Sequence, residues 1–133
     1  MWIVTTFGFF SAVEKPEDRS TPFLTVRARV RKDLVELLSR SKGKRPKILD
    51  DKRGDYRYRA RIRRGVLARI VADELLRLDY SNFKDEVRLK QGPKREGIYH
   101  RVWENLAELQ PTRPYAGRLP LETTWSDRWL SAG

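Results

Sequence analysis

The fold follows from two eight-residue runs, LTVRARVR at Leu24–Arg31 and YRYRARIR at Tyr56–Arg63, which begin 32 positions apart. Uncharged residues alternate with arginines through most of both runs, and this period of two is typical of a strand with one buried face. Each run is followed by apolar residues at helical spacing, such as Leu34, Leu37 and Leu38 after the first. We therefore predict an α+β fold with a ferredoxin-like split βαβ sheet, in which the two runs are neighbouring central strands.

Strand alternation divides the predicted sheet into two faces. We expect both helices to cover the apolar face, which comprises Leu24, Val26, Ala28, Val30, Tyr56, Tyr58, Ala60 and Ile62. The opposite face then carries Arg27, Arg29, Arg31, Arg57, Arg59, Arg61 and Arg63. The same alternation predicts that no aromatic side chain lies between these arginines.

The first thirteen residues are rich in β-forming side chains and are interrupted by Gly8. We expect them to form an N-terminal edge strand or hairpin, with Gly8 at a bulge or a tight turn. Phe7, Phe9 and Phe10 match in part the pattern by which RNA-recognition motifs present aromatic rings to bases. Because the Lys/Arg-Gly pair that opens that pattern is missing, we favour packing of the three rings in the core.

Residues 79–110 carry helical signals. Ser81 or Asn82 is a suitable cap for a short helix to about Lys90, and the Gln91–Pro93 segment ends it. An extra C-terminal helix follows, from about residue 94 to residue 110. Its apolar stripe is expected to pack against the core and consists of Tyr99, Val102, Trp103, Leu106 and Leu109.

Composition changes after residue 110, where prolines and glycines favour extended chain. We therefore predict one α+β domain over residues 1–110 and an extended tail over residues 111–133. Trp125 and Trp129 are four positions apart and would share one face of a helix. These two side chains either fold back on the domain or dock on a partner protein.

Positive charge is concentrated in one part of the chain. The protein has a net charge of +11, and residues 23–64 hold 16 Lys/Arg against 5 Asp/Glu, whereas the remainder holds 13 of each. Such a confined basic block is typical of a surface that binds a polyanion. A basic turn between the two repeats would extend the arginine surface along a phosphate backbone, or would simply be solvated; its cations are Lys42, Lys44, Arg45 and Lys47.

Few residue types for catalysis are present. The chain has no cysteine and one histidine, His100, which excludes disulfides, cysteine-zinc sites and multi-histidine metal sites. No phosphate-binding loop, dinucleotide-binding glycine pattern or nucleophile elbow occurs, so we expect no cofactor. Asp79, Asp85 and Glu86 fit the capped first turn of a helix better than a metal site. The one enzymatic alternative is a metal-independent ribonuclease with His100 as its catalytic candidate.

Membrane insertion and secretion are not predicted. No apolar run approaches the roughly 20 residues of a membrane span, and the N-terminus lacks the basic lead and cleavage site of a signal peptide. The absence of cysteine is compatible with a reducing compartment. We therefore expect a cytoplasmic protein.

Five segments together resemble a family of short bacterial proteins to which we attach no activity: MWIVTTFGFFSAV at the N-terminus, RARVR, DYRYR, DYSNFK and YHRVW. The resemblance covers roughly residues 1–110. It implies a bacterial, cytoplasmic, single-domain protein, and it implies no ligand or catalytic residue.

Function is predicted from the arginine-rich face. Guanidinium groups bind phosphate oxygens in pairs, so we expect a nucleic-acid-binding protein, with RNA favoured over DNA, rather than an enzyme. Contacts to phosphate carry little sequence information, so we expect binding with weak sequence specificity. A small subunit of a ribonucleoprotein complex would bind in this manner. The alternative is a protein-interaction module whose basic face or tryptophan tail docks on a larger partner. If the arginines instead pair with acidic groups of the third helix or the tail, they stabilise the fold.

Overall fold

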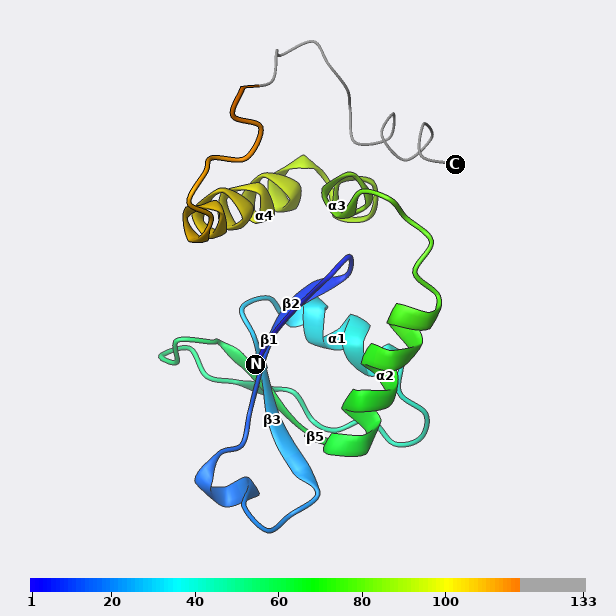
Figure 1. The fold of residues 1–133 in the computed structure, drawn as a ribbon. Helices are drawn as coiled ribbons and strands as arrows, with labels where there is room; N and C mark the ends of the chain where they lie inside the picture. Colours follow the sequence, from blue (N-terminus) through cyan, green and yellow to red (C-terminus); the bar gives the residue numbers. More distant parts are fainter. Residues whose placement is uncertain (118–133) are drawn as a thin grey trace. The chain divides into compact units, whose positions relative to one another are not determined.

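The structure, a computed structural model, describes residues 1–117, which belong to two compact units. The first, here called the sheet unit, spans Met1–Leu78, and the second, the helical unit, begins at Asp79. The sheet unit contains, in chain order, β1 (Trp2–Thr5), β2 (Gly8–Val13), the 3₁₀ turn η1 (Pro16–Asp18), β3 (Phe23–Ala28), α1 (Arg31–Ser39), β4 (Leu49–Asp50), β5 (Tyr58–Arg63) and α2 (Arg64–Leu76) (Figure 1). The helical unit contains α3 (Phe83–Gln91), α4 (Pro93–Leu106) and the 3₁₀ turn η2 (Ala107–Leu109).

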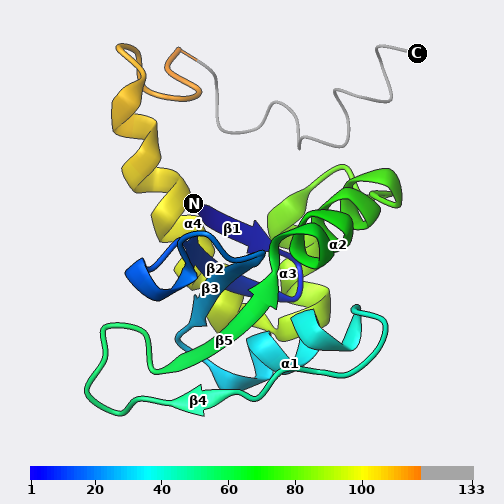
Figure 2. The ribbon, with the colours of Figure 1, turned by 90° about the horizontal axis from the view of Figure 1, so that it is seen from below.

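The sheet is antiparallel throughout, with strand order β1-β2-β3-β5-β4 (Figure 2). The two arginine-rich runs are therefore neighbours at its centre, as predicted, and Val26 pairs with Ala60 across them. They run antiparallel, whereas the predicted split βαβ layout would pair them in parallel, so that layout is not the observed one. The N-terminal segment forms the hairpin β1–β2, and β2 pairs with the free side of β3. The α+β class with one open antiparallel sheet is confirmed.

The core lies between the sheet and the two helices of the sheet unit, which share one side of the strands (Figure 1). Val26, Ala28, Ala60 and Ile62 are buried there, as strand alternation predicts. The helices contribute Leu34, Leu37, Leu38, Leu67 and Ile70 to the same cluster. Two predicted core residues lie elsewhere. Val30 is exposed because β3 ends at Ala28 and Val30 precedes the first turn of α1, and Tyr56 packs on the other face.

Gly8 opens β2 immediately after the turn of the hairpin and is required there by close packing. A Cβ atom at this position would lie 2.8 Å from Asp33 Cβ and 2.7 Å from Phe10 Cζ, closer than carbon atoms approach. The Asp33 carboxylate accepts a hydrogen bond from the backbone N–H of Phe9 at 3.1 Å, which ties the hairpin to α1. Phe7 and Phe10 are buried in the core, so core packing is confirmed for these two rings.

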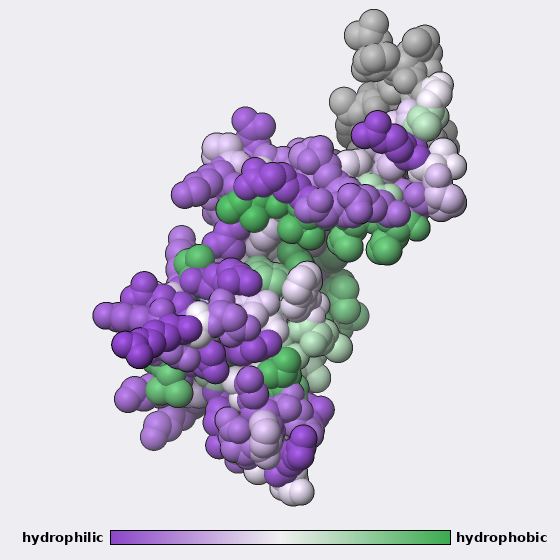
Figure 3. Space-filling view, turned by 90° about the vertical axis from the view of Figure 1, so that its left-hand side faces the viewer, coloured by the Kyte–Doolittle hydropathy of each residue, from purple (hydrophilic) through white to green (hydrophobic). Residues whose placement is uncertain are grey.

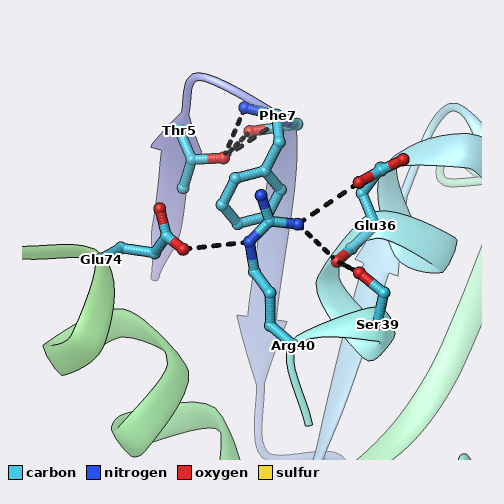
Figure 4. A network of polar contacts seen from close by, with 7 residues as sticks. Thr5, Phe7, Glu36, Ser39, Arg40 and Glu74 are labelled. Atoms are coloured by element: carbon cyan, nitrogen blue, oxygen red, sulfur yellow. Dashed lines mark hydrogen bonds and ion pairs between the residues drawn. The ribbon is translucent and has the colours of Figure 1, made fainter. Parts of the chain in front are cut away.

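Arg40 joins three elements of the sheet unit at the C-terminal end of α1 (Figure 4). Its guanidinium donates to the carbonyl oxygen of Glu36 at 2.7 Å and to the carboxylate of Glu74, on α2, at 3.0 Å. The same group lies 3.6 Å above the ring centre of Phe7, on the hairpin turn. Arg40 is thus a structural cation, whereas the lysines that follow it are not engaged in this way.

The helical unit is organised around α3 and α4. Asn82 caps α3 by accepting from the backbone N–H of Asp85 at 3.1 Å, so the predicted cap is confirmed and the acidic first turn is explained by the helix dipole. Between the helices Val87 is buried and the rings of Phe83 and Tyr99 stack with centres 5.9 Å apart.

The predicted apolar stripe of the last helix is largely exposed, which corrects the expectation that it packs in the core. Tyr99 is buried, but Val102, Trp103, Leu106 and Leu109 are exposed. Two helices bury only the strip along which they touch, and these residues lie outside it. Figure 3 shows hydrophobic side chains gathered along one side of this unit.

Some predictions about the chain ends stay predictions. Trp125 and Trp129 lie in residues 118–133, outside the described part of the chain. The boundary at residue 110 between domain and tail is likewise untested, although contacts among the described residues divide the chain earlier, after Leu78. None of the helices in residues 1–117 has the length and apolar character needed to cross a membrane.

Ala60→Glu should unfold the sheet unit, because the new carboxylate would sit without a partner beneath both helices at a site that is 2% exposed. The expected loss is several kcal/mol, comparable with the whole stability of a small domain. Ala68→Glu, which makes the same change at an exposed position of α2, is the control and should melt like the wild type. A cooperative thermal melt for Ala60→Glu, followed by circular dichroism, would contradict the assigned register.

Candidate nucleic-acid interface

The side of the sheet opposite α1 and α2 is here called the arginine face. Antiparallel pairing places Arg27 directly opposite Arg59, and Arg63 opposite Phe23. Arg61 projects from β5 on the same side. Hydrophilic residues dominate this side of the sheet unit, with a few hydrophobic ones among them (Figure 3).

Three of the seven predicted arginines lie beyond the strands. Arg29 directly follows β3 and is exposed, and Arg57 lies just before β5. Arg31 is the first residue of α1, so its assignment to the sheet face was wrong. The alternating pattern runs three residues past the end of β3, because Arg31 also fits the helical spacing that follows.

A loop over residues 51–57 lies on the arginine face and brings carboxylates to it. Asp55 lies 3.6 Å from both Arg27 and Arg59, and Asp51 lies 3.2 Å from Arg59. A hydrogen bond from the backbone N–H of Tyr56, together with the nearby guanidinium groups, holds the pKa of Asp55 below its usual value. Asp55 and Asp51 therefore neutralise much of the charge on the central pair of arginines.

Arg57 forms a separate ion pair at the edge of the sheet, with Asp50 of β4. Its Nε and one terminal nitrogen donate to the two carboxylate oxygens at 2.8 and 3.2 Å. This hydrogen bonding lowers the pKa of Asp50 and raises that of Arg57. Both side chains are about half exposed, so the pair contributes little to stability.

Asp18 is the most deeply buried acid of the arginine face and is fully enclosed. Its carboxylate accepts hydrogen bonds from the hydroxyl of Thr25 at 2.6 Å, from Nε of Arg61 at 2.9 Å and from the backbone N–H of Lys15 at 3.0 Å. Burial opposes ionisation and is the largest single influence on this group, but the hydrogen bonds and the charge of Arg61 together outweigh it. The pKa of Asp18 is consequently below its ordinary value.

Aromatic rings are interleaved with the arginines, contrary to the prediction. The guanidinium groups of Arg27 and Arg29 lie 4.6 and 4.5 Å from the ring centre of Tyr56. Tyr56 was assigned to the apolar face, but β5 begins only at Tyr58, so strand alternation does not apply to it. The ring centre of Phe9 lies 6.2 Å from that of Tyr56, which places Phe9 on this face rather than in the core.

Two more aromatic residues belong to this face. The rings of Trp2 and Phe9 meet edge to face, with centres 5.6 Å apart and planes at 85°. At the other end, Arg61 and Arg63 lie 4.9 and 5.0 Å from the ring centre of Phe23. Because consecutive residues of a strand point to opposite faces, the sequence already indicated that Phe9 and Phe10 could not both lie in the core. No sequence signal identified Trp2, because its face depends on the register of the hairpin.

The basic turn between α1 and β4 is different in character. Lys42, Lys44, Arg45 and Lys47 are all exposed. None of them forms an ion pair with a carboxylate in the part of the chain that the structure describes. Arg29 also lacks a carboxylate partner among the described residues and donates to the neutral carbonyl oxygen of Asp55 at 2.7 Å. These five cations keep their charge available to an external anion.

His100 belongs to the helical unit, where both of its ring nitrogens are engaged. Nδ1 lies 3.0 Å from Nζ of Lys84, and because a lysine ammonium can only donate, Nδ1 accepts. Nε2 lies 3.3 Å from the carboxylate of Glu104, and the ring stacks on Trp103. These contacts indicate a structural histidine. Within residues 1–117, no group of acidic or histidine side chains has the arrangement of a metal site.

Comparison with family models, with curated proteins and with solved structures found no match to this chain.

Asp18→Asn should lower the free energy of unfolding by about 1–3 kcal/mol at neutral pH, because it removes the charge that Arg61 and Thr25 contact. In the wild type, a depressed folded-state pKa adds stability that is complete above about pH 4 and is lost as the pH falls through the folded value. The variant should lack this part of the acid dependence. Denaturant titrations at a series of pH values measure it, with Glu17→Gln, which neutralises an exposed neighbour, as the control.

Arg59→Glu should destabilise the sheet unit by about 1–3 kcal/mol, since it sets a third carboxylate against Asp51 and Asp55. Arg63→Glu makes the same charge reversal on the same strand and face, where Arg63 pairs with no carboxylate of the described residues. That control should change stability by only about 0.5 kcal/mol. Equal melting temperatures for the two variants would show that the ion pairs of Arg59 carry no stability.

Proposed function

We propose that the sheet unit binds nucleic acid through the arginine face and the adjoining basic turn, with RNA favoured over DNA. The observation that supports this most directly is a set of exposed cations that pair with no carboxylate of residues 1–117: Arg29, Lys42, Lys44, Arg45 and Lys47. The sheet unit holds 20 Lys/Arg against 10 Asp/Glu, so it carries +10 of the protein's net charge. A surface of this sign attracts polyanions over a Debye length and binds phosphate without base specificity.

The paired and unpaired cations have different roles in this proposal. Arg59 and Arg61 are held by internal carboxylates and shape the surface, whereas Arg29 and the lysines of the basic turn are free to bind phosphate oxygens. Nε of Arg27 and Nε of Arg59 are buried without a hydrogen-bond partner, so the internal ion pairs leave part of each guanidinium unsatisfied.

The proposal extends to the fold and to the biological setting. We propose that the sheet unit keeps only the strand order of the ferredoxin-like arrangement, with β2 in the place of the last strand, because β3 and β5 run antiparallel where a split βαβ unit pairs its central strands in parallel. Such a sheet with one open face is a common support for RNA. A small basic unit that reads phosphate would suit a subunit of a cytoplasmic ribonucleoprotein complex.

A protein-interaction module is the second candidate, and one observation in the helical unit favours it. Val102, Trp103, Leu106 and Leu109 expose apolar surface along α4 and the turn that follows it. Contiguous apolar residues on a helix are typical of docking sites for other proteins. The two functions are compatible, because they use different units of the chain.

Lys44→Glu should weaken binding to every oligonucleotide tested by a similar factor, because phosphate contacts do not depend on base identity. The plot of log affinity against log salt concentration should also become flatter, by roughly 0.7 units for a single strand. Lys94→Glu reverses an exposed charge in the helical unit and is the control. Fluorescence anisotropy across a salt series measures both.

Two outcomes of that experiment would count against the proposal. If the wild type binds no oligonucleotide at low salt, the sheet unit does not bind nucleic acid. If Lys44→Glu and Lys94→Glu lose the same affinity, binding depends on net charge and not on the basic turn. Purification without nuclease treatment, followed by sequencing of any bound nucleic acid, tests the preference for RNA independently.

A further inference from the structure

Trp2 is the most exposed aromatic side chain of the arginine face, with 70% of its surface accessible. Tryptophan is usually well covered in folded domains, because its ring has a large apolar area. Trp2 lies on β1, the edge strand of the sheet, and meets Phe9 through an edge-to-face contact. An edge-to-face contact with one neighbouring ring covers at most one face of the indole, so the opposite face stays open to other contacts.

The exposed ring begins a continuous row of planar groups. Trp2 contacts Phe9, Phe9 contacts Tyr56, and the guanidinium of Arg29 lies over Tyr56. Exposure decreases along the aromatic part of this row, because Phe9 is half-buried and Tyr56 is 5% exposed. The row thus has an accessible aromatic end at Trp2 and a cationic end at Arg29.

The cationic end is available to an anion. Arg29 is exposed, and its guanidinium donates to a neutral carbonyl oxygen rather than to a carboxylate. The loop carboxylates that neutralise Arg27 and Arg59 do not reach it within ion-pair distance. A ligand that fits this row therefore has flat, apolar faces alternating with negative charges.

We propose that the row Trp2–Phe9–Tyr56–Arg29 is a stacking site for single-stranded nucleic acid, an inference that rests on the function proposed above. An unpaired base stacks on the indole of Trp2, and a phosphate further along the same strand binds the guanidinium of Arg29. Duplexes do not fit in this way, because their base faces are already stacked on each other. Stacking on one aromatic ring contributes about 5- to 150-fold in affinity and tolerates any base.

The test compares two probes of about 12 nucleotides with the same backbone, an oligouridylate and an abasic RNA that has riboses and phosphates only. The full-length wild type should bind oligouridylate about tenfold more tightly than the abasic strand. Trp2→Leu should remove this difference and leave binding of the abasic strand unchanged. Trp2→Phe keeps an aromatic ring and should retain most of the difference in affinity between the two probes. Val4→Leu, at another exposed position of β1, is the control for altering an apolar side chain on that strand.

The outcomes separate the two proposals. Equal affinity for both probes, unaffected by Trp2→Leu, would overturn the stacking site and leave phosphate binding intact. A duplex bound as tightly as the single strand at the same salt concentration would also overturn it. If the wild type binds neither probe at low salt, the proposed function itself fails. Thermal melts of Trp2→Leu verify folding, which a side chain this exposed should hardly affect.

Discussion

Antiparallel pairing of β3 with β5 places Arg27 directly opposite Arg59, and the sheet unit is arranged to offset that repulsion. Like charges on directly opposed residues destabilise a strand pair, and more arginines follow along β5. Three carboxylates from outside the strands compensate: Asp18 from η1, and Asp51 and Asp55 from the loop before β5. The irregular connections from β2 to β3 and from β4 to β5 therefore supply the carboxylates that allow the two arginine-rich strands to pair.

This compensation changes how the charge of the protein is understood. A net charge of +11 suggests a uniformly basic surface, but the structure divides the cations into two populations. Arg27, Arg59 and Arg61 are held by internal acids, and their neutralised charge contributes less to the field outside the protein. The cations of the basic turn have no such partners among the described residues, so they dominate long-range attraction. The cations of the basic turn thus provide the attraction for polyanions, whereas the arginines paired with internal acids determine the shape of the surface.

Much of the fold could be predicted because period-two alternation depends only on local sequence. Val26, Ala28, Ala60 and Ile62 alternate with arginines, and burying them requires the helices that follow. What escaped prediction depends on contacts between distant segments. Tyr56 continues the alternation in sequence, yet its backbone lies outside β5 and its ring packs on the opposite face. The carboxylate of Asp18 meets Arg61, which lies 43 positions later in the chain, and no local pattern indicates such a pair.

Apolar spacing was informative about secondary structure but not about burial. The stripe on α4 correctly predicted a helix, yet only Tyr99 of the stripe is buried, because two helices cover only the strip along which they touch each other. On the arginine face, the regular spacing of the arginines gave no indication that aromatic rings lie among them. Phe9 is half-buried because Tyr56 covers one side of it, and Tyr56 is in turn held by two guanidinium groups. Arginine here has a second use besides charge, because its planar guanidinium group packs on Tyr56, the inner ring of the aromatic row that begins at Trp2.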